Sequence, residues 1–217
     1  GLYSDISSVE IDTYLAETAA ALTVEHPDYS YLAARIKVNS LHKETPGFII
    51  ATKNLYDDGL LREDYYKKVM ENADAIESVI DYDKDYTFDY FALTTLIRAY
   101  LLKFDNKTIE RPQDLWMRVT LTVTGNEFNL DKIKETYKSL STGTYTHATP
   151  TLFNSGLKMQ QLSSCFLIGM EDDSIEGIFN TIKDCALISK TAGGIGMHAH
   201  NIRGSGSRIK STNGKSN

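Results

Sequence analysis

Three consecutive segments in the last third of the chain most constrain its fold, because they alternate between strand and helix patterns. Residues 162–170 are apolar and rich in β-forming side chains, residues 175–190 have helical periodicity, and residues 194–199 form a second short apolar run. A strand, a helix and a strand in this order make a βαβ unit, whose usual outcome is a parallel sheet. The sequence therefore predicts an α/β domain in this region.

The earlier part of the chain is predicted to be mainly helical, because apolar residues recur there at helical spacing. One exception is a short hairpin, expected around Asp105-Asn106-Lys107. A single long amphipathic helix is expected over residues 60–80, with Leu61, Tyr65 and Val69 on its apolar face. Helices are expected over residues 7–25, 28–43, 47–56, 60–80, 88–97, 111–123 and 131–140.

Charge is distributed unevenly along the chain. The formal net charge is −6, yet residues 201–217 hold four of the 23 Lys and Arg and none of the 29 acids, so residues 1–200 carry −10. This basic segment points to a local anionic partner, with a disordered tail as the alternative. The segment is no P-loop, because Ile209 stands where that motif needs glycine, and the same residue breaks a dinucleotide fingerprint beginning at Gly204.

Two cysteines are too few for a disulfide scaffold, which favours a reducing compartment. There is no apolar run near the roughly 18–20 residues that span a bilayer, and no signal-peptide pattern, so we expect a cytoplasmic protein without a membrane partner. Cys185 shares a helix face with Ile178 and Ile182 and is expected to be buried and inert. Cys165 follows Ser163 and Ser164 and begins an apolar run, so a redox thiol and a structural thiol both remain open.

Residues near both ends of the predicted helix at 175–190 could end the helix or contact a ligand. Asp173 or Ser174 is expected to cap the helix, and the same groups after a strand could hold a sugar hydroxyl. Glycines 193 and 194 end the helix and permit close approach of a ligand. His198 and His200 share a strand face, but neighbouring residues supply no further Cys or carboxylate, so we expect no metal site.

Longer motifs resemble the large, catalytic subunit of ribonucleotide reductase, in its class I form. They are THATPTLFNSG at 146–156, QLSSCFL at 161–167, DDSIEGIFNTIKDCALISKTAGGIG at 172–196 and IRGSGSRIKSTNGKSN at 202–217, supported by residues 16–44 and 110–119. The resemblance implies an α/β fold class, in which a mostly helical N-terminal domain precedes the first strands of a ten-stranded α/β barrel. It implies that residues 1–45 are the C-terminal part of an ATP-cone-like region, 46–145 the helical domain, and 146–217 the beginning of the barrel.

The resemblance also implies roles for individual residues. Cys165 matches a redox-active cysteine that reduces the ribose and ends in a disulfide with a second cysteine. Thr149, Ser164 and Gly194 match positions that hold the ribonucleoside diphosphate substrate. An allosteric dNTP or ATP effector is implied around the helix start, with Lys190 and Arg203 near it. The matching effector residues are Asp173, Ser174, Ile175, Lys190, Arg203, Ile209, Lys210 and Ser211.

The partners implied by the resemblance are a radical-generating small subunit with a di-metal centre, a thioredoxin- or glutaredoxin-type reductant and a second copy of the large subunit. The helix that starts near Asp173 would then also be a dimer contact surface. No covalently bound cofactor and no direct contact with nucleic acid is expected. The radical cysteine and the disulfide partner of Cys165 lie beyond Asn217, so the chain is expected to be an N-terminal fragment that is inactive alone. A nucleotide-binding or dimerisation piece of a split reductase is the alternative.

Overall fold

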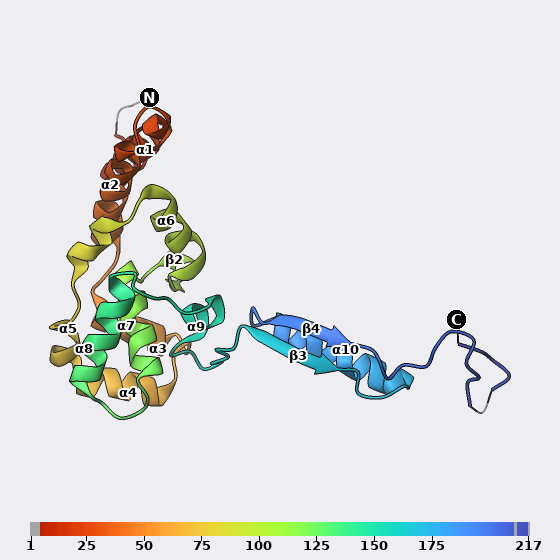
Figure 1. Ribbon diagram of the computed structural model, residues 1–217. Coiled ribbons are helices and arrows are strands. Elements are labelled where there is room, and N and C mark those ends of the chain that lie inside the picture. The colour runs from red at the N-terminus through yellow and green to blue at the C-terminus, as the bar shows by residue number, and fades with distance from the viewer. Residues whose placement is uncertain (1–4, 211, 217) are drawn as a thin grey trace. The chain divides into compact units, whose positions relative to one another are not determined.

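The computed structural model describes residues 5–210 and 212–216, which form two compact units (Figure 1). The first unit runs to His147 and adds Leu152–Gln160, and the second comprises Ala148–Thr151 and the chain from Gln161 onward. A mostly helical part followed by a strand–helix–strand part confirms the expected fold class. Within the described residues, no helix is both long and apolar enough to cross a membrane.

The first unit is helical apart from one short antiparallel hairpin. The hairpin turns through Asp105 and Asn106, whose φ angles of 48° and 61° are the left-handed values that such a turn needs. The elements are α1 (Ser8–Ala21), η1 (Leu22–Val24), α2 (Asp28–Glu44), α3 (Phe48–Asp57), α4 (Glu63–Glu71), α5 (Ala73–Glu77), η2 (Tyr82–Thr87), α6 (Tyr90–Thr95), η3 (Leu96–Tyr100), β1 (Lys103–Phe104), β2 (Lys107–Thr108), α7 (Pro112–Val123) and α8 (Leu130–Ser141).

Two of the helices expected from periodicity are wrong in detail. The helix expected over 60–80 is divided into α4 and α5 at Asn72, whose φ of −126° and ψ of 24° leave the helical region. Its side-chain amide donates to the Lys68 carbonyl at 2.8 Å, which shows how asparagine competes with the helical backbone. The helix expected over 88–97 begins as α6 and continues as the π-helix η3 to Tyr100.

Helix α7 lies at the centre of the first unit. Ten of its twelve residues are buried, because it packs against α8 and against several shorter elements. Its apolar contribution includes Leu115, Met117 and Leu121, all at most 1% exposed. It also buries Asp114 and Arg118, and buried charges need partners.

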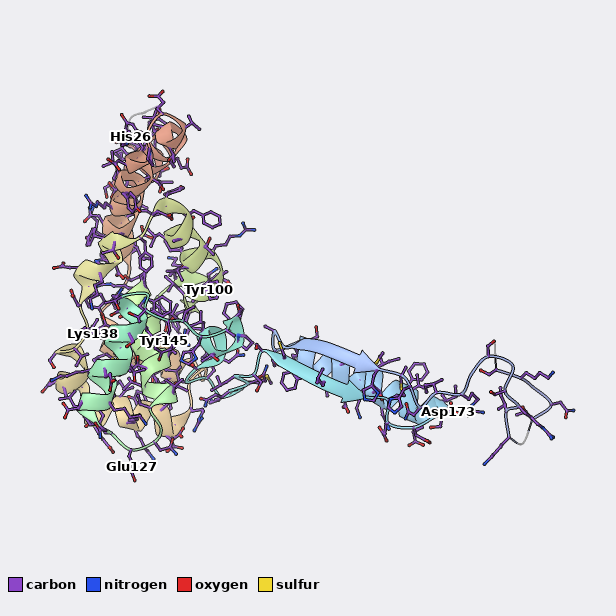
Figure 2. The ribbon with its side chains drawn as sticks, in the orientation of Figure 1. His26, Tyr100, Glu127, Lys138, Tyr145 and Asp173 are labelled. Atoms are coloured by element: carbon purple, nitrogen blue, oxygen red, sulfur yellow. The ribbon has the colours of Figure 1, made fainter. Side chains whose placement is uncertain are left out.

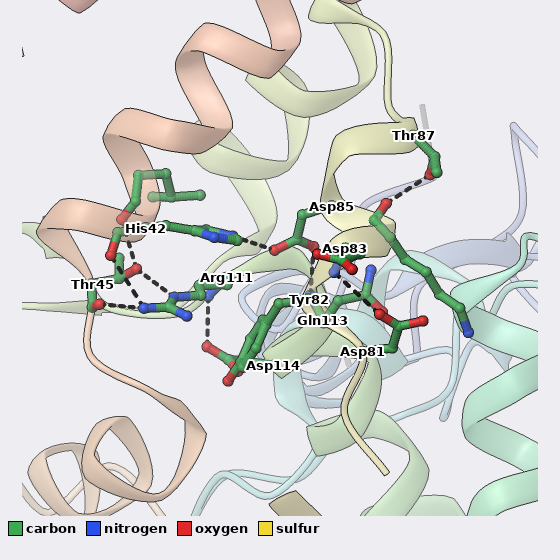
Figure 3. A network of polar contacts seen from close by, with 12 residues as sticks. His42, Thr45, Asp81, Tyr82, Asp83, Asp85, Thr87, Arg111, Gln113 and Asp114 are labelled. Atoms are coloured by element: carbon green, nitrogen blue, oxygen red, sulfur yellow. Dashed lines mark hydrogen bonds and ion pairs between the residues drawn. The ribbon is translucent and has the colours of Figure 1, made fainter. Parts of the chain in front are cut away.

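A polar network joins the start of α7 to the end of α2 and to η2 (Figure 3). The Asp114 carboxylate accepts from the Tyr82 hydroxyl at 2.7 Å and from the Arg111 backbone N–H at 2.8 Å. The Arg111 guanidinium donates to the Thr45 hydroxyl and carbonyl at 2.9 and 2.8 Å. His42 bonds the buried Asp85 carboxylate at 2.7 Å. These contacts fasten the long α2 helix to the core of its unit.

The network makes the stability of the first unit depend on pH. Burial raises the pKa of Asp114 to about 7, far above its value in the unfolded chain. Between those two values the folded protein binds more protons than the unfolded protein, so the free energy of unfolding falls as pH rises toward 7. Urea unfolding from about pH 5 to 7 should show this fall, and it should be smaller in Asp114→Asn. Burial also raises the pKa of Asp85, so this carboxyl adds a slope of the same sign.

The exposed Asp57→Asn variant is the control for this measurement. Its pH profile should run parallel to that of the unaltered chain, because Asp57 is solvated in both states. A difference between the unaltered chain and Asp114→Asn that stays constant with pH would contradict the assignment.

The second unit is a parallel two-stranded sheet with one helix. It contains β3 (Cys165–Gly169), α10 (Ile175–Ser189) and β4 (Gly194–His198), and β3 pairs with β4 in parallel. This confirms the predicted order and direction, although β3 is shorter than the expected 162–170. Helix α9 (Thr149–Asn154), which periodicity did not predict, lies in a segment shared by the two units.

Candidate functional site

Cys165 lies on the face of the sheet that points away from α10. On the α10 side, a Cβ added at Gly193 would lie 2.9 Å from the Phe166 ring and 2.6 Å from Ile188 of the helix, so Phe166 points toward α10. Side chains alternate along a strand, which puts Cys165 and Leu167 on the opposite face. Leu167 is 93% exposed and Cys165 is exposed too. The thiol is therefore accessible from the open face.

Two other predicted substrate residues lie beside this thiol. Cys165 is in register with Gly194, and the Gly194 N–H donates to the Ser164 carbonyl at 2.7 Å. The Ser164 hydroxyl lies 3.7 Å from the Cys165 sulfur. A Cβ at Gly194 would approach the Ser164 carbonyl to 3.1 Å, so a side chain there would be crowded. The structure thus brings Ser164, Cys165 and Gly194 together.

Glycine occurs in every cross-strand pair on this open face. The three pairs are Cys165 with Gly194, Leu167 with Gly196, and Gly169 with His198. Next to the thiol, Gly194 carries no side chain and a Cβ there would lie 4.0 Å from the Cys165 sulfur, whereas the Leu167 and His198 side chains lie over Gly196 and Gly169. Glycine at such positions permits close approach of a ligand.

Thr149 enters the same unit from a separate segment. It is half-buried and begins α9. The first turn of α9 is tied to the start of the strand segment by the Thr151 hydroxyl, which donates to the Leu162 carbonyl at 3.0 Å. The structure thus places Thr149 in the unit that contains Cys165, while the contacts around the thiol itself come from Ser164 and Gly194.

At the start of α10, Ser174 caps the helix and Asp173 makes a different contact. Ser174 is the N-cap, because its hydroxyl accepts from the Gly177 N–H at 3.0 Å. Asp173, which is labelled in Figure 2, instead pairs with Arg203. The Arg203 guanidinium donates to the Asp173 carboxylate and carbonyl, both at 2.7 Å. Ile175 follows with its side chain 75% exposed. The Asp173–Arg203 pair thus ties the basic segment to the helix start.

The basic segment folds back on itself as a loop. Backbone bonds join Gly206 to Ser216 at 2.7 Å and Ile209 to Gly214 at 3.1 Å. An open pocket of about 440 Å³ forms between this loop and the helix start, within the usual size range of small-molecule sites. Its lining residues are Asp173, Arg203, Ser207, Arg208, Ile209 and Lys210.

The pocket gathers positive charge that suits an anionic ligand. Arg203, Arg208 and Lys210 face a single acid, Asp173, among its lining residues. Arg and Lys side chains are the usual partners of phosphate oxygens. Arg208 is not among the effector residues expected from the resemblance, although the cluster of cations in residues 201–217 is the signal that points to it. The predicted effector residue Ser211 lies outside the described residues.

The expected position of Lys190 near the helix start is wrong for a single chain. Lys190 is the C-cap of α10, and Ser174 is the N-cap. Fifteen helical residues lie between these caps and span about 22 Å at 1.5 Å per residue. Periodicity identifies this helix correctly, but its length places the two ends too far apart for one ligand contact.

Two other expectations concern Cys185 and metals. Cys185 was expected to be buried, but it is only half-buried. Its neighbour Ile182 on the same helix face is 50% exposed, so this face is only partly covered. The His198 and His200 rings approach each other, with their Nδ1 atoms 2.6 Å apart. Across residues 5–210 and 212–216, no group of three or more His, Cys, Asp or Glu is arranged to hold a metal ion.

Comparison with known proteins gives matches over both units. Residues 86–160 match the family model described as the ribonucleotide reductase all-alpha domain, and residues 163–217 match its barrel domain. The chain is 47% identical to ribonucleoside-diphosphate reductase large chain 2 of Saccharomyces cerevisiae, over all of this chain and 26% of that protein. It is 47% identical to the large chain of Schizosaccharomyces pombe and 46% identical to the large subunit of Arabidopsis thaliana, over 28% of each. The chain therefore spans little more than a quarter of these relatives.

Proposed function

The chain belongs to the family of ribonucleotide reductase large subunits, and from this premise we propose that it forms part of the catalytic subunit of a ribonucleoside-diphosphate reductase. In this role it contributes one reducing thiol, part of the substrate site and part of an effector site. The single observation that most supports the proposal is the exposed Cys165 thiol between Ser164 and Gly194, on a sheet face lined with glycine.

The proposed reaction replaces the 2′-hydroxyl of a ribonucleoside diphosphate by hydrogen. A small subunit with a di-metal centre supplies the radical that starts this chemistry. Cys165 and a second thiol, which lies outside this chain, together give two electrons and two protons. The 2′-oxygen leaves as water, a C2′–H bond forms, and the two sulfurs join in a disulfide. A thioredoxin- or glutaredoxin-type dithiol then reduces that disulfide by thiol–disulfide exchange.

The residues around Cys165 hold the substrate in this proposal. The Ser164 hydroxyl and Thr149 are hydrogen-bonding groups for the ribose and diphosphate oxygens, and Gly194 allows the substrate to approach the backbone. The absence of a side chain at Gly194, which pairs with Cys165, supports this assignment, because it leaves the backbone beside the thiol open to a sugar.

The pocket at the start of α10 is the proposed effector site for a dNTP or ATP. Arg203, Arg208 and Lys210 offer the phosphate contacts, and Asp173 with the Ser174 cap fixes the helix end. Ile175, Ile209 and Ser211 complete the proposed set, Ile175 and Ile209 as apolar contacts for a base. Two guanidinium groups and one ammonium within one pocket support a polyphosphate ligand.

A second copy of the chain is the proposed partner of the outer face of α10. Ile175, Phe179 and Ile182 follow one another at helical spacing on this face and are 75%, 63% and 50% exposed. A two-fold axis would pair the helix with its own copy. In an antiparallel pair, Lys190 of one copy lies at the Asp173 end of the other, which reconciles the distance along α10 with the proposed effector role of Lys190.

The remaining proposals follow the same family assignment. Residues 1–45 are proposed as the end of an ATP-cone-like region, 46–145 as the helical domain and 146–217 as the first part of the barrel. The proposed location is the cytoplasm.

The direct test of this function is an assay of the complete large subunit with a ribonucleoside diphosphate, a dithiol and the radical-generating subunit. We expect deoxyribonucleoside diphosphate to form, and we expect this chain alone to give none, because it lacks a second reducing thiol in reach of Cys165. Absence of product from the complete subunit would contradict the proposal, as would turnover by the isolated chain.

Effector binding gives a second test. Arg203→Ala should weaken dTTP binding to the complete subunit by about tenfold, which corresponds to one charge-assisted contact of about 1.4 kcal/mol. Arg35→Ala, on α2 in the other unit, is the matched control and should bind normally. Equilibrium binding of labelled dTTP measures both. Equal affinity for dTTP in Arg203→Ala and the unaltered subunit would refute the assignment.

A nucleotide-binding or dimerisation piece of a split reductase is the second candidate function. The basic pocket and the exposed face of α10 favour it, since both lie within this chain. It predicts dNTP binding by the isolated chain, weakened by Asp173→Ala. No binding at millimolar dNTP would count against it.

A further inference from the structure

Three separate segments supply the four residues proposed to hold and reduce the substrate. Thr149 comes from the start of α9, Cys165 and the preceding Ser164 from the start of β3, and Gly194 from the start of β4. Backbone pairing of β3 with β4 already joins the second and third segments, with the Gly194 N–H on the Ser164 carbonyl at 2.7 Å. Two side chains outside the proposed site add further ties, and one of them reaches α9.

Thr151 joins the first segment to the second. It is 7% exposed and lies in the first turn of α9, two residues after Thr149. Its hydroxyl donates to the Leu162 carbonyl at 3.0 Å, three residues before Cys165. A valine here would keep the shape of the side chain but remove the donor.

Gln161 joins the second segment to the third. Its side-chain carbonyl accepts from the Ser163 backbone N–H, and its amide lies 3.5 Å from the Thr191 carbonyl and 3.4 Å from the Thr191 hydroxyl. The Thr191 hydroxyl in turn donates to the Ile188 carbonyl at 2.9 Å at the end of α10. The glutamine therefore connects the chain that enters β3 with the chain that enters β4.

We propose that Thr151 and Gln161 are positioning residues, which hold the Ser164–Cys165 segment in register with α9 and with the loop that leads to Gly194. Neither side chain touches the substrate in this proposal. They act on the neighbouring peptides at Leu162 and Ser163, so that the thiol and the substrate contacts stay in one arrangement. This inference rests on the proposed reductase function and names two residues that the family resemblance does not assign.

The expected kinetic effect follows from what Cys165 does. The thiol reacts only in the chemical steps, so loss of its alignment lowers kcat more than it raises KM. Small displacements of reacting groups cost rate steeply, and we expect about a tenfold fall in kcat with less than about a threefold change in KM.

The experiment uses the complete reductase with two pairs of variants. Thr151→Val removes the hydroxyl and Thr151→Ser keeps it, so kcat should fall in the first and stay within about threefold in the second. Gln161→Glu keeps the acceptor for Ser163 but loses the donor to Thr191, so kcat should fall. Its matched control is Gln160→Glu, at the neighbouring glutamine, which accepts from the Gly156 N–H at 3.3 Å in the other compact unit.

Alkylation of Cys165 against pH gives a readout that a loss of stability alone would not move. Its profile should change in Thr151→Val and Gln161→Glu at a temperature where every variant is folded, and stay unaltered in Thr151→Ser and Gln160→Glu. The inference is overturned if Thr151→Val and Gln161→Glu keep full kcat. It is also overturned if kcat falls as far in Thr151→Ser as in Thr151→Val, because the effect would then come from side-chain packing. Failure of the proposed reductase function is distinguishable from failure of this inference, because the unaltered reductase would then give no product.

Discussion

Replacing Cys165 by serine is expected to abolish multiple turnover of the complete reductase. Serine has nearly the same shape, but its hydroxyl neither forms a disulfide nor supplies an electron to the ribose. The proposed substrate contacts at Ser164 and Gly194 are unaltered, so the variant should still bind the ribonucleoside diphosphate. Product formation under excess dithiol, together with equilibrium binding of the substrate, measures the two effects separately.

Cys185→Ser is the matched control for this prediction. Cys185 lies on α10, on the far side of the sheet from the open face, and is half-buried. It should retain turnover within about threefold, which is a change below 1 kcal/mol in the barrier. Turnover by Cys165→Ser at a rate similar to that of Cys185→Ser would show that Cys165 carries no reducing role.

Replacing Arg118 by methionine is expected to cause the largest loss of stability of any single change considered. The Arg118 guanidinium and the Glu110 carboxylate form an ion pair at 2.5 Å, with side chains 2% and 3% exposed. Arg118 also donates to the Ser155 carbonyl at 2.9 Å. Removing one partner of a buried pair leaves the other charge uncompensated, so we expect a loss of about 3–5 kcal/mol in the free energy of unfolding.

The controls for Arg118→Met separate the buried pair from ion pairs in general. Arg62→Met breaks the more exposed pair with Asp64 and should cost about 0–1 kcal/mol. Adding Glu110→Gln to Arg118→Met should recover part of the loss, because the unpaired charge is then gone. Urea unfolding of the chain measures all three. A loss below about 1 kcal/mol in Arg118→Met would contradict a structural role for the pair.

The parts of the fold that follow from periodicity could be predicted from the sequence. The strand and helix patterns in residues 162–199 predict β3, α10 and β4 in the right order, because the spacing of apolar residues along the chain is a local property. The local sequence likewise limits the N-cap of α10 to two residues, Asp173 or Ser174. The choice between them was not local: Arg203, thirty residues away, engages Asp173 and leaves Ser174 as the cap.

Other features depend on contacts that periodicity does not contain. Asn72 divides one expected helix because its side chain bonds the preceding turn, and Asp114 and Arg118 are buried in α7 because distant residues pair with them. The positioning roles inferred for Thr151 and Gln161 likewise rest on bonds between segments that are separated in sequence. The distance of Lys190 from the helix start follows from the length of the helix predicted over residues 175–190, which the placement taken from the resemblance did not consider.

A single turnover without external reductant tests the central claim most directly. The complete reductase, fully reduced at the start, is mixed with one equivalent of ribonucleoside diphosphate and its radical-generating subunit, then alkylated under denaturing conditions and mapped by mass spectrometry. We expect Cys165 to be recovered in a disulfide in proportion to the deoxyribonucleotide formed, and Cys185 to be recovered as an alkylated free thiol. Product formation with Cys165 still fully alkylated would contradict the reducing role of Cys165.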